Sequence, residues 1–166
     1  MSGFYKRAGD GEGLRILLSI LVALALAIVP LPDWAGSIRP DWVALLVIYW
    51  SLALPRKFGV GSAWVSGLAL DTLQGALLGQ HALGLALVAF VVLKFYLRIR
   101  VFPIWQQAMT VFMLLTLNQF VLFWVDGLAG SGEIQLGRWM PVVAGTLLWP
   151  LLAQALSVVR RQRSGR

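Results

Sequence analysis

One carboxylate lies in the middle of a strongly apolar stretch. Asp71 stands within GVGSAWVSGLALDTLQGALLGQHALG, residues 59–84, and no other acidic or basic residue occurs between Lys57 and His81. A charged side chain at the centre of a bilayer costs about 2.5–3.5 kcal/mol on insertion scales. Such a group normally faces protein, water or a ligand. Asp71 is therefore the first candidate for a functional residue.

Three roles are open for Asp71. It could be a packing residue, because polar groups often hold transmembrane helices together by hydrogen bonds. It could instead contact a partner protein or a ligand near the outer face of the membrane. A proton relay is disfavoured, because a relay needs several ionisable groups in line. No other ionisable residue falls in the core of an expected span.

Small residues recur around this carboxylate. Ala63, Gly67, Asp71, Gly75 and Gly79 are spaced four residues apart. On one helix, this spacing places them along a single face. Small residues at such spacing let a second backbone approach closely. We therefore expect the glycines to form a close-packing stripe beside the carboxylate.

Polar side chains accompany the stripe. Gln74 lies within its range, Gln80 and His81 follow it, and Asn118 and Gln119 lie at a similar depth in a later apolar segment. Either of the later two amides could donate a hydrogen bond to the Asp71 carboxylate. The residues predicted to bind a partner or pack helices are Gly67, Asp71, Gln74, Gly75, Gly79, Gln80, His81 and Asn118.

The residue types disfavour several function classes. The sequence lacks cysteine and holds one histidine, which argues against a metal centre. We find no nucleophile with a base, no phosphate-binding glycine loop and no paired carboxylates within the apolar segments. We therefore expect no enzyme and no cofactor. The net charge of +7 resides in loops, so it indicates membrane topology and no nucleic-acid partner.

The composition predicts the elements that position these residues. The chain is 59% hydrophobic, against about 45–50% for a typical soluble domain. It is therefore expected to be an all-α polytopic membrane protein with a bundle of six transmembrane helices. The expected spans are about 14–29, 40–54, 58–78, 81–97, 103–125 and 139–159. We divide the chain into an N-terminal tail (1–13), a transmembrane domain (14–159) and a basic tail (160–166).

The distribution of basic residues predicts the orientation. With a cytoplasmic N-terminus, the outer loops contain only Arg39 and Arg138, and all other basic residues lie inside. The positive-inside rule then puts both termini in the cytoplasm. Asp71 lies in the outer half, and Trp34, Trp42, Tyr49 and Trp50 are expected in interfacial aromatic belts.

Two motifs in order resemble the MreD family of rod shape-determining membrane proteins. The first is RPDWVALLVIYWSLALP, and the second is G-x-x-x-D-x-x-x-G-x-x-x-G-Q-H-A-L. The resemblance covers essentially the whole chain. The first motif carries over to Arg39, Pro40, Asp41 and Tyr49, and the second to Gly67, Asp71, Gly75, Gly79, Gln80 and His81.

The resemblance implies a non-enzymatic scaffold subunit of the complex that builds lateral peptidoglycan in the bacterial inner membrane. The implied direct partner is MreC. MreB, RodZ, RodA and its transpeptidase partner belong to the same complex, and membrane lipids surround it. The implied fold is similar to the substrate-binding subunits of energy-coupling-factor transporters. That likeness supplies the alternative function, a small-molecule (vitamin-like) binding subunit of a membrane transporter.

Overall fold

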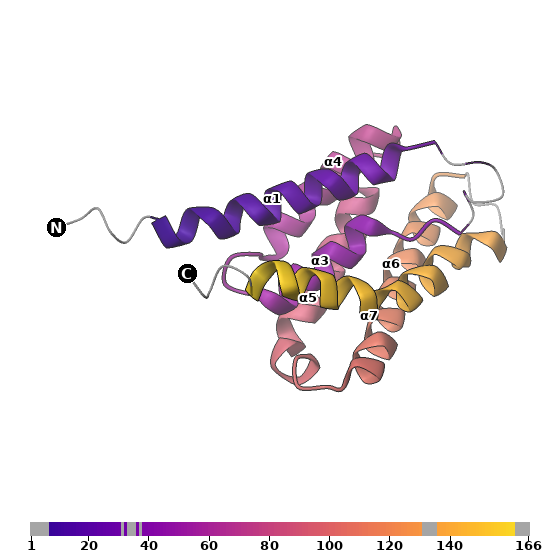
Figure 1. The fold of residues 1–166 in the computed structure, drawn as a ribbon. Coiled ribbons are helices and arrows are strands. Elements are labelled where there is room, and N and C mark those ends of the chain that lie inside the picture. Colours follow the sequence, from indigo (N-terminus) through magenta and orange to yellow (C-terminus); the bar gives the residue numbers. More distant parts are fainter. Residues whose placement is uncertain (1–6, 31, 33–35, 37, 131–135, 162–166) are drawn as a thin grey trace.

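The regular secondary structure of the described residues consists of helices alone. The computed structural model describes residues 7–30, 32, 36, 38–130 and 136–161. Within them it forms six α-helices and one short 3-10 helix, and no strand (Figure 1). They are α1 (Arg7–Ile28), α3 (Trp42–Ala53), α4 (Val60–Gln74), α5 (Gln80–Ile99), α6 (Ile104–Leu128), η1 (Leu136–Trp139) and α7 (Met140–Arg161). The predicted all-α polytopic bundle is thereby confirmed.

The helices fall into two length classes. Among the described residues, four helices are long and apolar enough to cross a membrane, and they are α1, α5, α6 and α7 with the end of η1. Helices α3 and α4 have 12 and 15 residues. At about 1.5 Å per residue they measure about 18 and 22 Å, less than the roughly 30 Å hydrocarbon core.

The short helix α3 forms the centre of the bundle. Every residue from Val43 to Leu52 is buried, and α3 packs against α1, α4, α5, α6 and α7. Tyr49 and Trp50 are 7% and 4% exposed, and their rings meet edge to face at 5.2 Å. Both rings face protein within the bundle, and their expected depth at the membrane interface stays a prediction. They pack in the core because α3 has protein on all sides. Trp34 lies outside the described residues.

Helix α1 begins earlier than the sequence suggested. It starts at Arg7, inside the stretch expected to be a loose tail. An ion pair between Glu12 of α1 and Lys57 of the α3–α4 loop holds its first turns to the bundle. The start of α1 and the end of α7 lie at the same side of the molecule (Figure 1). The division of the chain into two tails and a transmembrane domain stays a prediction.

Helix α4 ends earlier than predicted. It stops at Gln74 and not at Leu78, because Gly75 adopts a left-handed conformation with φ 65°. Gly79 precedes α5 with φ 99°. A turn therefore separates the two helices, so the glycine stripe does not continue along one helix. Only Ala63, Gly67 and Asp71 of the repeat lie in α4.

Helices α4 and α5 form the most extensive helix pair. A Cβ atom added to Gly67 would lie 2.3 Å from the Ala82 Cα atom and 2.8 Å from the His81 carbonyl carbon. Both are backbone atoms, which cannot move aside without moving α5. The predicted close backbone approach is therefore present at Gly67.

Candidate functional site

The Asp71 carboxylate lies at the start of α5 and is completely buried. Its Oδ1 atom accepts from the backbone N–H of His81 at 2.9 Å and lies 2.8 Å from His81 Nδ1. Its Oδ2 atom accepts from the N–H groups of Gly79 at 2.9 Å and Ala82 at 3.4 Å. Both carboxylate oxygens are thus fully used within the α4–α5 hairpin.

This geometry follows from the capping requirements of a helix. The first N–H groups of a helix have no partner within it, and a side-chain oxygen just before the helix usually accepts from them. Gly79 has no side chain to do so. Asp71, one helix away, supplies the missing acceptor, and its negative charge suits the positive end of the α5 dipole. These contacts support the packing role that the sequence left open.

Gly75 and Gly79 have a conformational role in the turn between α4 and α5. No atom lies within 4 Å of a Cβ atom added to either residue. Within the described part of this chain, no other backbone approaches either position, and their contact with a partner stays a prediction. Their positive φ angles are what require glycine, because the turn must reverse within the few residues that bring His81 back to Asp71.

Asn118 bonds a different carboxylate from the one considered in the sequence. Its Nδ2 atom donates to Asp41 Oδ2 at 3.1 Å, and among the described residues no hydrogen bond joins it to Asp71. Asp41 also caps α3, because its Oδ1 atom accepts from the Ala44 N–H at 3.0 Å. A Cβ atom added to Gly84 would lie 2.3 Å from Asn118 Oδ1. Gly84 therefore leaves the room in which Asn118 reaches α3.

A second polar network joins the α4–α5 hairpin to α6. Gln80 Nε2 donates to Asp126 Oδ1 at 2.6 Å, and Asp126 forms an ion pair with Arg138 of η1. Asp126 and Arg138 were not among the predicted site residues. Their only sequence signal was opposite charge in one outer loop, which does not identify Gln80 as a partner.

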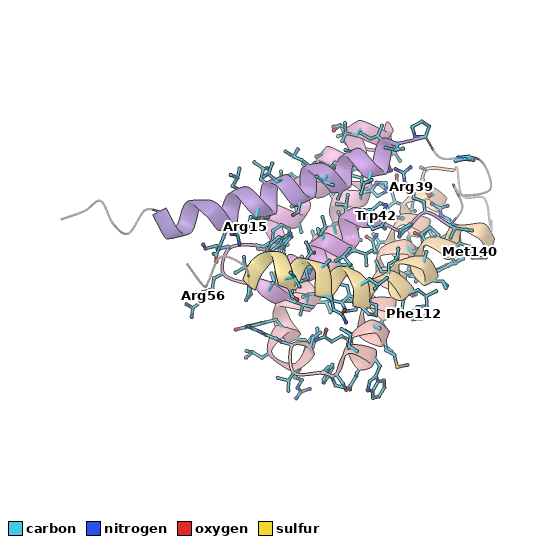
Figure 2. All side chains as sticks on the ribbon, in the orientation of Figure 1. Arg15, Arg39, Trp42, Arg56, Phe112 and Met140 are labelled. Atoms are coloured by element: carbon cyan, nitrogen blue, oxygen red, sulfur yellow. The ribbon has the colours of Figure 1, made fainter. Side chains whose placement is uncertain are left out.

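A small pocket lies among these groups. Its volume is about 170 Å³, and its wall includes Arg39, Asp41, Gln74, His81 and Gln119. We call it the Arg39-end pocket. It is built where α1, α4 and α6 approach their ends and where α3, α5 and α7 begin. Figure 2 shows Arg39 at the opposite end of the bundle from Arg15 and Arg56.

The predicted site residues therefore separate into groups. Gln74 and His81 line the Arg39-end pocket together with Arg39, Pro40 and Asp41. Tyr49 does not: it lines another pocket of about 300 Å³, which also includes Arg100 and Trp149. The remaining predicted residues support the pocket from behind, through the α4–α5 hairpin and the Asn118 bond to Asp41.

The pocket offers hydrogen-bonding groups without an evident set of reacting groups. The His81 side chain is 15% exposed, and its Nδ1 atom is held by Asp71. Across the described residues, no group of three or more His, Asp and Glu side chains could hold a metal ion. The arrangement suits recognition of a polar group by fixed side chains.

A family model described as rod shape-determining protein MreD matches residues 11–159. The chain belongs to the MreD family. It is therefore a membrane protein involved in determining rod shape. The MreD match spans every described α-helix, although the first turn of α1 and the last residues of α7 extend beyond it.

A curated relative agrees with the MreD assignment. The rod shape-determining protein MreD of Haemophilus influenzae is 29% identical over 151 residues, which cover 91% of this chain and 93% of the relative. No solved structure matches the chain significantly. The likeness of this MreD-family fold to vitamin-transporter subunits therefore stays a prediction.

Proposed function

We propose that this MreD-family protein is a non-enzymatic scaffold subunit of the bacterial cell-wall elongation complex, and that it binds MreC directly. Family membership supports the rod-shape role. The observation that carries the proposed contact is the Arg39-end pocket, where segments of both sequence motifs meet. A partner side chain entering it would touch residues from the ends of several helices at once.

The rigidity of the pocket favours a protein partner. Asp71 fixes His81, and Asn118 fixes Asp41. Such preorganised side chains lose little conformational freedom on binding. The pocket of about 170 Å³ is smaller than the roughly 300–1,000 Å³ of typical small-molecule sites. Its size therefore favours a protruding side chain of a partner over a whole vitamin-like molecule.

The proposed location is the bacterial inner membrane, with both termini in the cytoplasm. Arg15 and Arg56 lie at the end of the bundle opposite Arg39 (Figure 2), which supports this orientation. A reporter fused after Arg100 should then read cytoplasmic, and one fused after Ser131 should read periplasmic. In this orientation the Arg39-end pocket faces the periplasm. We propose that MreB, RodZ, RodA and its transpeptidase partner join the same assembly through MreC or beside it.

The proposed MreC contact is tested by filling the pocket. Gln119 lines it, whereas the neighbouring Phe120 is 49% exposed on the outside of α6. Gln119→Trp should prevent co-purification of MreC and should not restore rod shape to a depleted host. Phe120→Trp, the matched control, should co-purify with MreC and should restore rod shape.

Three results would contradict this proposal. A Gln119→Trp protein that binds MreC normally would exclude the pocket as the contact. Depleted cells that remain rod-shaped would exclude the shape role in that host. Purification of the protein with a bound small molecule and ATPase subunits would favour the transporter alternative.

A further inference from the structure

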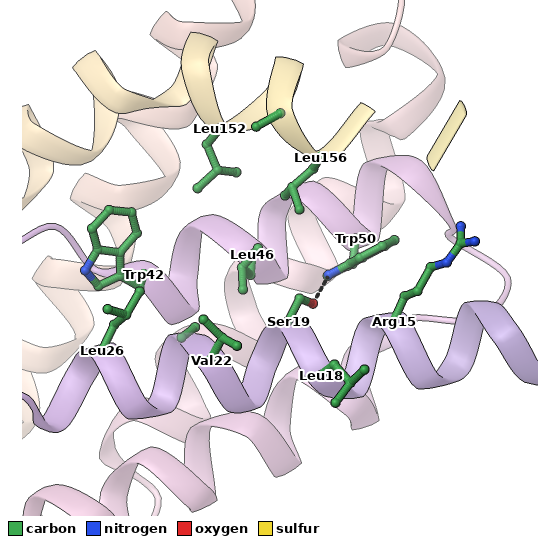
Figure 3. Close-up of a pocket in the computed structure, with 12 residues that line it drawn as sticks. Arg15, Leu18, Ser19, Val22, Leu26, Trp42, Leu46, Trp50, Leu152 and Leu156 are labelled. Atoms are coloured by element: carbon green, nitrogen blue, oxygen red, sulfur yellow. Dashed lines mark hydrogen bonds between the residues drawn. The ribbon is translucent and has the colours of Figure 1, made fainter. Parts of the chain in front are cut away.

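An apolar groove runs between α1 and α7, over one side of α3. Its volume is about 470 Å³, and its walls are almost entirely hydrocarbon. Figure 3 shows Leu152 and Leu156 of α7 facing Val22 and Ser19 of α1 across it, with Leu46 of α3 at its floor. The groove lies on a different side of α3 from the Arg39-end pocket, and the two share only Trp42.

Two polar side chains in the wall of the groove already have hydrogen-bond partners. The Trp50 indole N–H donates to Ser19 Oγ at 2.8 Å, and Ser19 Oγ donates to the Ile16 carbonyl at 2.8 Å. A ligand in the groove therefore meets no free hydrogen-bonding group along most of its length. Hydrocarbon is the chemistry that such a wall accepts.

A cation stands at one end. Arg15 lines the groove near Trp50, on the side away from Trp42 and Leu26 (Figure 3). Within the described part of the chain, no acceptor is assigned to the Arg15 guanidinium. A second apolar groove, between α1 and α4, also has a cation at its wall, but there Lys57 is already paired with Glu12.

The groove has the length of one membrane leaflet. Arg15 and Leu26 are eleven positions apart in α1, which is about 16 Å along a helix. Half of a hydrocarbon core is about 15 Å. A transmembrane helix about 10 Å wide and 30 Å long occupies on the order of 2,000 Å³. The groove therefore accommodates a thinner chain than a helix.

We infer that this groove binds an anionic phospholipid, with its phosphate on Arg15 and an acyl chain along α1, α3 and α7. The unpaired guanidinium selects the negative headgroup, and the apolar wall holds the chain. In the orientation proposed above, the Arg15 end faces the cytoplasmic leaflet, where a basic residue near the surface attracts anionic lipid.

The test measures which lipid stays bound. The full-length protein is reconstituted with equal amounts of phosphatidylglycerol and phosphatidylethanolamine that carry the same acyl chains, extracted in mild detergent and weighed by native mass spectrometry. The wild type should retain phosphatidylglycerol preferentially. Arg15→Gln should lower that retention about fivefold, the effect of one basic residue near an anionic surface. Arg15→Lys should keep most of it.

Further variants locate the bound lipid. Ala155 lines the groove and is exposed, so Ala155→Trp should fill it and remove the bound lipid. Leu147→Trp, at a 74% exposed position of α7 outside the groove, should not. Arg98→Gln removes an exposed basic residue outside the groove and should leave retention unchanged. Circular dichroism establishes that each variant is folded. If Ala155→Trp does not fold, Val22→Trp fills the groove from the α1 side instead.

The inference is overturned by any of three results. The first is an Arg15→Gln protein that retains as much phosphatidylglycerol as the Arg98→Gln protein. The second is a wild-type protein that retains phosphatidylglycerol and phosphatidylethanolamine equally. The third is a co-purified polypeptide, and no lipid, that crosslinks to the groove.

Discussion

Replacement of Asp71 by Asn is the substitution that best separates packing from partner binding. Asn keeps one acceptor oxygen and replaces the other by an NH₂ group, which cannot accept a hydrogen bond. In one orientation of the amide the N–H groups of Gly79 and Ala82 lose their acceptor, and in the other the N–H of His81 does. Because both carboxylate oxygens accept backbone N–H bonds in the buried hairpin, one side must lose its acceptor whichever way the amide turns.

The expected loss can be worked out from these bonds. A buried N–H left without an acceptor costs about 1–3 kcal/mol, and the lost charge at the α5 N-terminus adds about 0.3–1 kcal/mol. Asp71→Asn should therefore lower the free energy of unfolding by about 1.5–4 kcal/mol. For a chain of this size, that corresponds to a fall in melting temperature of roughly 3–15 °C. Asp71→Leu should cost more, because it removes every acceptor.

Thermal unfolding in detergent, followed by the amount of protein that stays monodisperse, measures this loss. Thr72→Val is the control, because the Thr72 hydroxyl is exposed and bonds only the Ala69 carbonyl of its own helix. An Asn variant that melts at the wild-type temperature would refute the capping role. A stable Asn variant that fails to support rod shape would instead indicate that a partner requires the charge.

The glycines give two further predictions, both measured by the same melting assay. Gly67→Ala should be destabilising by about 1–3 kcal/mol, because its new methyl group overlaps the α5 backbone, whereas Gly61→Ala in the same helix has open space and should be neutral or stabilising. Gly75→Ala and Gly79→Ala should each cost about 1–2 kcal/mol through their left-handed backbone, and Gly75→Asn should cost less, since Asn tolerates this conformation. Equal melting of Gly67→Ala and Gly61→Ala, or of Gly75→Asn and Gly75→Ala, would contradict these explanations.

The sequence predicted the helices well because their signals are local. An apolar run predicts a span, Asp41 caps the start of α3, and Pro103 directly precedes α6, as expected for a residue that begins a helix. The same local signals were ambiguous at Gly75. Glycines four residues apart fit both a packed helix face and a helix followed by a tight turn, so the spacing alone does not separate the two.

The pairing of polar groups could not be predicted in the same way. Asn118 bonds Asp41 across 77 positions, and Gln80 bonds Asp126 across 46. The depth of Asn118 suggested a hydrogen bond to Asp71, whereas the amide bonds Asp41. Which carboxylate it meets depends on how α3, α5 and α6 pack, and no periodicity within one helix records that. Asp126 was assigned to a loop, although α6 continues to Leu128.

The shortness of α3 has a consequence for the synthesis of this protein. Much of the surface that buries α3 belongs to α5, α6 and α7, which follow it in the chain. The ribosome adds about 5–20 residues per second, so roughly 5–20 s pass between the end of α3 and the end of α7. During that time a helix of about 18 Å lies in a bilayer with a core of about 30 Å, without most of the protein surface that later covers it.

Insertion of the early part of the chain is therefore completed by its late helices. A nascent chain that ends before α5 should leave α3 exposed to insertion factors and membrane proteases. Its half-life should increase sharply once α5 is included, because α5 makes the most extensive contact with α3. Quality control of this protein thus acts on whether its C-terminal half arrives in time.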